Sequence, residues 1–239
     1  MFSDMARRAM WSRPSAFEIE FMRQQAQRSS SPKSVFLIGL SVSQGAPSGI
    51  AILERFKPPP SPGQRCVATY VCRYLRRWLP PDTAYPVLVA DLSVMLNGPL
   101  VRSDLIVEAG SSIKPVVSML RKQRLPAHIC PVEVKVSAED TFVGGAWRVG
   151  KGSLIETTRL VLQEERMSFD EQMPAEVMAT TPSVRTVYQA LLTYPFERSP
   201  AANDAFAARE GEYDDLVVAV AMACWYGENC KKTFRMLYC

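Results

Sequence analysis

The chain has few of the residues that build a metal site from nitrogen or sulfur ligands. His128 is its one histidine, which excludes a multi-histidine metal centre and argues against a Ser-His-Asp triad. Its six cysteines, at positions 66, 72, 130, 224, 230 and 239, form no Cys-x-x-Cys pair. We therefore expect reduced thiols in a cytosolic protein and no zinc site.

Long apolar runs and a strong net charge are also missing. No apolar stretch reaches the roughly 20 residues of a membrane-spanning helix, and the N-terminus shows no signal-peptide pattern, so we expect a cytoplasmic protein without membrane contact. The formal net charge is only +4 over 239 residues, which is compatible with a polyanionic partner but does not require one. A hydrophobic content of 47% is typical of a globular protein with a sizeable core.

The most informative stretch lies near the C-terminus, at residues 212–225. Two adjacent carboxylates, Asp214 and Asp215, open a run that is apolar on every face, which is typical of a helix buried inside a domain. Their charge is favourable beside the positive end of the helix dipole, so a capping role is the simplest interpretation. A catalytic role depends on other carboxylates lying nearby.

Hydrophobic patterning predicts an α/β domain. Strands are expected at residues 35–40, 49–56, 65–73, 105–110 and 127–136, and helices at 86–96, 112–123, 153–166, 183–192 and 212–225. The first three strands are joined by short loops, which indicates an antiparallel meander. The later alternation of strands and helices indicates parallel pairing with helices on the faces of the sheet. Asp91 is expected on the exposed surface of its helix.

The chain divides into one domain with a tail at each end. We interpret residues 1–33 as an N-terminal tail or linker, residues 34–230 as the domain, and residues 231–239 as a basic C-terminal tail. Residues 141–152 are expected to form a glycine-containing loop that carries Arg148 and Lys151. This loop nearly matches a P-loop, but no Ser or Thr directly follows the lysine, so nucleotide binding is not expected.

This element order resembles the ribonuclease H-like fold, in which a three-strand antiparallel meander and parallel strands form a mixed five-stranded sheet with helices on both faces. The resemblance implies that acidic side chains from strand one, strand four and the last helix converge at one sheet edge. Glu108 has the strand-four position, and Asp214 and Asp215 have the helix position. Converging carboxylates recruit Mg²⁺ or Mn²⁺, and two such ions support phosphodiester hydrolysis.

A series of short motifs makes the resemblance more specific. They occur in order at residues 38–44, 73–75, 85–86, 105–110, 147–151 and 213–219. Each motif is weak alone, but together residues 34–229 resemble the C-terminal nuclease domain of the large subunit of tailed-phage terminases and their prophage relatives.

The terminase resemblance implies a function. The implied function is that of a metal-dependent endonuclease, a hydrolase that cuts double-stranded DNA during packaging in a bacterial or phage-infected cell. Glu108, Asp214 and Asp215 would be its catalytic metal ligands, and Arg148 and Lys151 would contact the DNA backbone. A packaging ATPase, another terminase subunit or the portal would be the protein partner.

Two departures from the family pattern bear on catalysis. Ser41 stands where the family has its first aspartate, and Glu108 stands where an aspartate is usual. Glutamate keeps a carboxylate, whereas a neutral hydroxyl cannot supply the charge that bridges two divalent ions. Glu54, on the second expected strand, is another carboxylate that could compensate.

Several outcomes therefore stay open. The first three alternatives are a protein that binds one metal ion, a nuclease that cuts weakly, and an inactive ribonuclease H-like module for DNA binding or assembly. A resolvase-like or transposase-like nuclease is a further alternative; we expect no separate DNA-reading domain beyond the short N-terminal tail, which argues against transposition.

Overall fold

The computed structural model describes most of the expected domain. The described residues are 19–20, 23–24, 34–43, 46–58, 66–79, 84–110, 114–136, 139–170, 184–193 and 214–230. The expected C-terminal tail and nearly all of the expected N-terminal tail lie outside them, so the predicted domain boundaries stay predictions.

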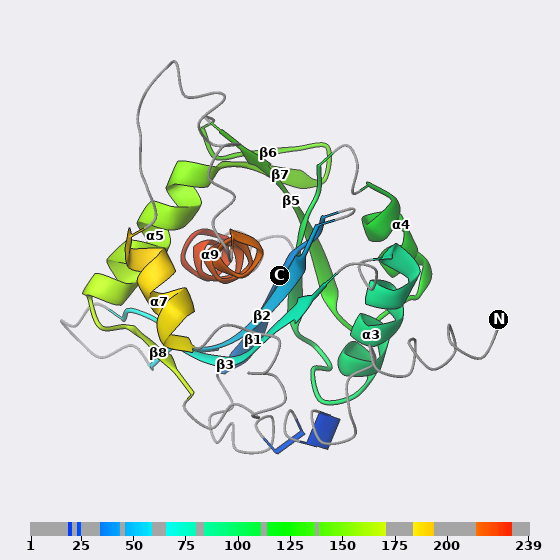
Figure 1. The fold of residues 1–239 in the computed structure, drawn as a ribbon, viewed down its shortest axis with the longest axis horizontal. Helices are drawn as coiled ribbons and strands as arrows, with labels where there is room; N and C mark the ends of the chain where they lie inside the picture. Colours follow the sequence, from blue (N-terminus) through cyan, green and yellow to red (C-terminus); the bar gives the residue numbers. More distant parts are fainter. Residues whose placement is uncertain are drawn as a thin grey trace.

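A mixed sheet of eight strands forms the centre of the molecule, in the order β6-β7-β5-β4-β1-β2-β3-β8 (Figure 1). The strands are β1 (Val35–Ser41), β2 (Ser48–Phe56), β3 (Thr69–Trp78), β4 (Asp104–Glu108), β5 (His128–Lys135), β6 (Thr141–Val143), β7 (Ala146–Gly150) and β8 (Met167–Phe169). Strands β1 to β3 pair antiparallel, and β1, β4, β5 and β7 pair parallel. The predicted α/β class is confirmed, but the predicted number of five strands is wrong.

Helices cover both faces of the sheet (Figure 1). One face carries α3 (Tyr85–Asn97) and α4 (Lys114–Lys122), and the other carries α5 (Lys151–Gln163), α7 (Val184–Thr193) and α9 (Asp214–Asn229). Each face has its own apolar core, because alternate residues of β1 point to opposite sides: Leu37 toward α9, and Ile38 and Leu40 toward α3 and α4. In the described part of the chain, no helix is both long and apolar enough to cross a membrane.

Residues 141–152 are not the loop that the sequence predicted. They form the β6–β7 hairpin, whose turn is made by Gly144 and Gly145 with φ of +62° and +80°, and then enter α5. Arg148 therefore lies on β7, and Lys151 is the first residue of α5. A Gly-Gly pair between two strand-like runs is a known signal for a two-residue hairpin turn, so this element could have been found from the sequence.

Asp91 was predicted to be exposed on the surface of α3, but it is fully buried. Strand β3 extends beyond the predicted end at residue 73 as far as Trp78. The Trp78 indole Nε1 donates a 2.9 Å hydrogen bond to Asp91 Oδ2, and the Arg76 guanidinium lies 3.8 Å from the same oxygen. The prediction failed because a helical pattern does not reveal polar partners on a neighbouring strand.

Helix α9 lies directly on the sheet because two glycines leave room for its backbone. A Cβ at Gly39 would lie 1.9 Å from the carbonyl oxygen of Ala219, and a Cβ at Gly49 would lie 2.8 Å from the carbonyl carbon of Asp215. The predicted buried helix with an acidic first turn is confirmed, since every residue from Leu216 to Gly227 is buried. Gly49 thus brings the N-terminus of α9 close to the start of β2.

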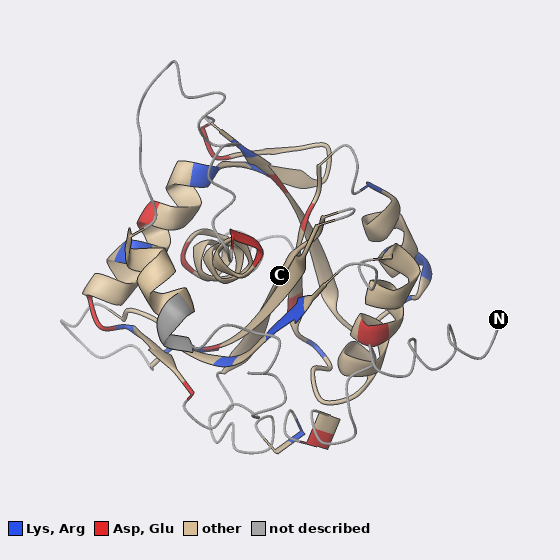
Figure 2. Cartoon of the chain, in the orientation of Figure 1, with Lys and Arg blue, Asp and Glu red and all other residues tan. Residues whose placement is uncertain are grey.

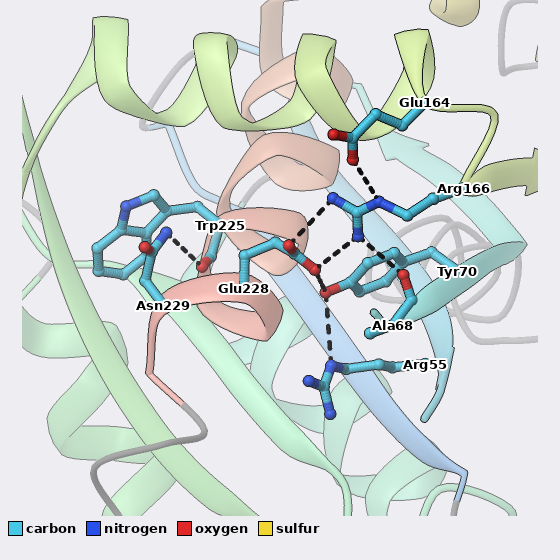
Figure 3. Close-up of polar contacts among 8 residues, drawn as sticks. All are labelled: Arg55, Ala68, Tyr70, Glu164, Arg166, Trp225, Glu228 and Asn229. Atoms are coloured by element: carbon cyan, nitrogen blue, oxygen red, sulfur yellow. Dashed lines mark hydrogen bonds and ion pairs between the residues drawn. The ribbon is translucent and has the colours of Figure 1, made fainter. Parts of the chain in front are cut away.

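The C-terminal end of α9 is held by a separate polar cluster, drawn in Figure 3. Arg166 donates to both carboxylate oxygens of Glu228 at 3.1 Å, and to the carbonyl oxygen of Ala68 at 2.8 Å. The Tyr70 hydroxyl donates to Glu228 at 2.5 Å, and burial together with nearby acidic groups raises the pKa of that tyrosine. The last turn of α9 is thereby tied to β3 and to the end of α5.

Candidate functional site

The candidate site begins with a row of residues across one end of the sheet. Ser41 on β1 pairs in register with Gly49 on β2, which pairs with Arg77 on β3. On the other side of β1, parallel strand β4 ends at Glu108. Because Gly49 has no side chain, the acidic first turn of α9 sits over the middle of this row.

Ser41 and Glu108 are joined directly. The Ser41 hydroxyl donates a 2.8 Å hydrogen bond to Glu108 Oε2. Burial raises the pKa of the Glu108 carboxyl; the Ser41 bond and the charge of Lys151 oppose this rise, and the charge of Asp214 adds to it. The end of β4 and the first turn of α9 are therefore close enough to interact electrostatically.

Lys151 lies at this site, although the sequence predicted it on a DNA-contacting loop. Its Nζ is 3.1 Å from both carboxylate oxygens of Asp214. The Lys151 side chain is 16% exposed, and that of Asp214 is 38% exposed. The start of α5 thus contributes a cation to the edge where the sequence predicted metal ions.

Asp215 has a different partner and pairs with Arg77. The Arg77 Nε donates to Asp215 Oδ2 at 2.8 Å, and both side chains are largely buried. Arg77 was not among the predicted site residues, because the third strand was expected to end at residue 73. The run from Thr69 to Trp78 is rich in aromatic and β-branched residues, which was the available signal that the strand continues.

The arrangement can be tested for its fit to divalent cations. Among the described residues, no three His, Cys, Asp or Glu side chains form a group that could hold a metal ion. Asp214 and Asp215 each have a basic partner, and Glu108 accepts a bond from Ser41. A two-ion site, which needs a surplus of carboxylates, does not fit here. For a single Mg²⁺ or Mn²⁺ the remaining donors are Glu108 and Asp214, and Lys151 Nζ lies 3.1 Å from both carboxylate oxygens of Asp214.

Two other residues that the sequence singled out, Arg148 and Glu54, lie away from this site. Arg148 is an exposed residue of β7 that pairs with Glu133 at 3.1 Å. Glu54 is fully buried and accepts a bond of 2.9 Å from Arg73. It pairs in register with Phe36, near the opposite end of β1 from Ser41. Glu54 therefore cannot replace the missing aspartate.

Charged side chains from several elements lie around the N-terminal end of α9. Figure 2 shows acidic residues on α9 and basic residues on the sheet and on α5 around it. The local chemistry is thus a set of carboxylates paired with basic side chains, at an edge formed by β1, β3, β4, α5 and α9.

No family model matches the chain, and no curated protein and no solved structure is significantly similar to it.

Proposed function

We propose that the chain is a divergent terminase-type nuclease domain with a ribonuclease H-like fold, acting on double-stranded DNA as an Mg²⁺- or Mn²⁺-dependent endonuclease during viral DNA packaging. The observation that carries the proposal is the meeting of Ser41, Glu108 and Asp214 at one sheet edge. These three residues come from the end of β1, the end of β4 and the start of the last described helix. The order of motifs along the sequence is independent support.

In this proposal Glu108 and Asp214 hold one divalent cation. When bound, the cation supplies charge stabilisation and polarises a phosphodiester oxygen. Ser41 keeps the Glu108 carboxylate oriented through its 2.8 Å bond, and Arg77 keeps Asp215 away from the cation. Lys151 contacts a backbone phosphate of the DNA, since an ammonium on a long side chain is a good phosphate partner.

Exposed Arg148 adds a second contact to the DNA backbone from the β6–β7 hairpin. Such phosphate contacts position the duplex without reading its sequence. A packaging ATPase, another terminase subunit or the portal would deliver the DNA. These partners follow from the terminase resemblance alone.

A second candidate function is a catalytically inactive ribonuclease H-like module for DNA binding or assembly. The bond from Ser41 to Glu108 and the cations on Asp214 and Asp215 favour it, because all three carboxylates are already engaged. This candidate keeps the duplex contacts and omits hydrolysis.

Nicking of supercoiled plasmid separates the two candidates. Wild-type protein should nick in Mn²⁺ and not in EDTA, and Glu108→Gln and Asp214→Asn should abolish nicking. Glu164→Gln, an exposed carboxylate at the distant end of α5, is the matched control and should retain activity. If the wild type is silent but shifts duplex DNA in a gel, and Ser41→Asp gains nicking, the inactive module is the correct assignment.

A further inference from the structure

Asp140 joins the start of α5 to α9. It lies directly before β6 in the chain, and its carboxylate accepts three hydrogen bonds. The backbone N–H of Gly150 donates to Asp140 Oδ1 at 3.4 Å, and the Ser153 hydroxyl donates to Oδ2 at 2.7 Å. The Trp225 indole Nε1 donates to the same Oδ2 at 2.9 Å. One carboxylate thus connects the first turn of α5 to a residue near the end of α9.

The bonds from Asp140 supply a cap that α5 does not have in its own sequence. Gly150, which precedes the first turn, has no side chain with which to cap the helix, and the first turn contains no acidic residue. A carboxylate beside a helix N-terminus is favourable, because it accepts bonds from the first polar groups and interacts with the positive end of the helix dipole. Asp140, ten residues earlier in the chain, provides this carboxylate.

The bond to Trp225 ties Asp140 to the core. Trp225 is 1% exposed, and its ring packs edge-on against Trp147 of β7 with 5.4 Å between the ring centroids. A buried indole N–H needs an acceptor, and Asp140 is the acceptor here. The start of α5 is therefore located by a contact with a core residue.

Lys151 is the residue whose position follows from this arrangement. It comes directly after Gly150 as the first residue of α5, and its Nζ lies 3.1 Å from both carboxylate oxygens of Asp214. A lysine side chain is flexible, so the place that its ammonium reaches depends on a fixed backbone. Resting on the proposed function for the role of Lys151, we propose that Asp140 is a positioning residue: it fixes the first turn of α5 so that Lys151 meets Asp214 and, in the complex, a duplex phosphate.

Removing the charge of Asp140 separates positioning from simple electrostatics. Asp140→Asn keeps the size of the side chain but leaves one acceptor oxygen for three donors. Loss of a negative charge alone should strengthen DNA binding, because DNA is a polyanion. Loss of positioning should weaken it. Glu139→Gln is the matched control, since it makes the same change of charge at the neighbouring exposed residue.

The first measurement is the affinity of the full chain for a short duplex at several salt concentrations, with every variant kept below its melting temperature. Asp140→Asn should weaken binding and reduce the salt slope by about one, as Lys151→Met should, because one phosphate contact is lost. Ser153→Ala removes one bond and no charge, and should change the affinity in the same direction by less. Glu139→Gln should keep the wild-type slope.

Combination with Lys151→Met shows whether Asp140 acts through Lys151. In that background Asp140→Asn should cause no further weakening. The proposal is overturned if Asp140→Asn binds the duplex as tightly as the wild type, or if it weakens binding equally with and without Lys151.

A double-mutant cycle on unfolding tests the positioning without DNA. Urea unfolding of Lys151→Met, Asp214→Asn and the double variant gives the coupling between the two side chains. This coupling should be present in the wild-type background and lost in Asp140→Asn. Coupling that is absent from the wild type, or that persists in Asp140→Asn, overturns the proposal. If the coupling depends on Asp140 while the wild type binds no duplex, the positioning stands and the proposed function is wrong.

Discussion

Glu108 shows how one residue links burial to pH dependence. Burial raises its pKa above the ordinary value of 4.5, so the folded protein takes up this proton more readily than the unfolded chain. The stability contributed by Glu108 is therefore present below about pH 4.5 and is lost as pH rises through the folded-state pKa. Relative to Glu108→Gln, the wild type should lose unfolding free energy across this range. Urea unfolding between pH 4.5 and 8 measures the difference, and parallel curves for the two proteins would contradict it.

Gly39 tests the close contact between α9 and the sheet. Gly39→Ala places a methyl group 1.9 Å from the carbonyl oxygen of Ala219, so the backbone of β1 or α9 must shift to admit it. We expect a loss of roughly 1–3 kcal/mol in unfolding free energy, as for other overpacked cores. Val94→Ile adds a methyl group at a site that is 47% exposed and should change little in the same urea experiment. Equal stability of the two variants would mean that α9 can move away from β1.

The ion pairs that join helices and strands differ in how far their side chains are exposed to solvent. Arg166 is 9% exposed and holds Glu228 at the last turn of α9, whereas Arg148 on β7 is 53% exposed and holds Glu133. Arg166→Met should cost about 2–3 kcal/mol, because it leaves a partly buried carboxylate without its cation. Arg148→Met should cost below about 1 kcal/mol, as is usual for surface pairs. Chemical unfolding of both variants checks the ranking, and similar losses would show that the α9 cluster adds no special stability.

Elements also differ in how well the sequence predicts them. Helix α9 was predicted with its acidic first turn, because a continuous apolar run and two adjacent aspartates are local signals. The three residues of β8 carry no comparable signal, since they become a strand only by pairing with β3. Hairpin β6–β7 carried a local signal in its two glycines and was misinterpreted as a loop.

At the scale of the whole molecule, three buried thiols report on how the core opens. Cys72 on β3, Cys130 on β5 and Cys224 in α9 belong to the same core, and burial raises the pKa of each to about 12. Alkylation therefore requires opening of the structure. All three should react with iodoacetamide at the same slow rate at pH 8, measured by peptide mass spectrometry, and the partly exposed Cys66 should react quickly. Faster labelling of Cys130 would indicate that β5 opens separately.

The sequence by itself determined the α/β class, the buried last helix and the carboxylates at Glu108, Asp214 and Asp215, because periodicity and charge placement are local properties of the chain. It also determined that position 41 lacks a carboxylate. The resemblance to the ribonuclease H-like fold, and not these local features, led us to expect a candidate site at the ends of the first and fourth strands.

Only the tertiary structure decided what each carboxylate contacts. Lys151 is 63 residues from Asp214 in sequence, and Arg77 is 138 residues from Asp215. Their pairing depends on strand register and on the missing side chain of Gly49, which lets α9 approach the sheet. Burial of Asp91 has the same origin, since its hydrogen-bond partner Trp78 lies on strand β3. Neutralisation of a charge is a property of the space around it, and that space is assembled only when distant segments pack together.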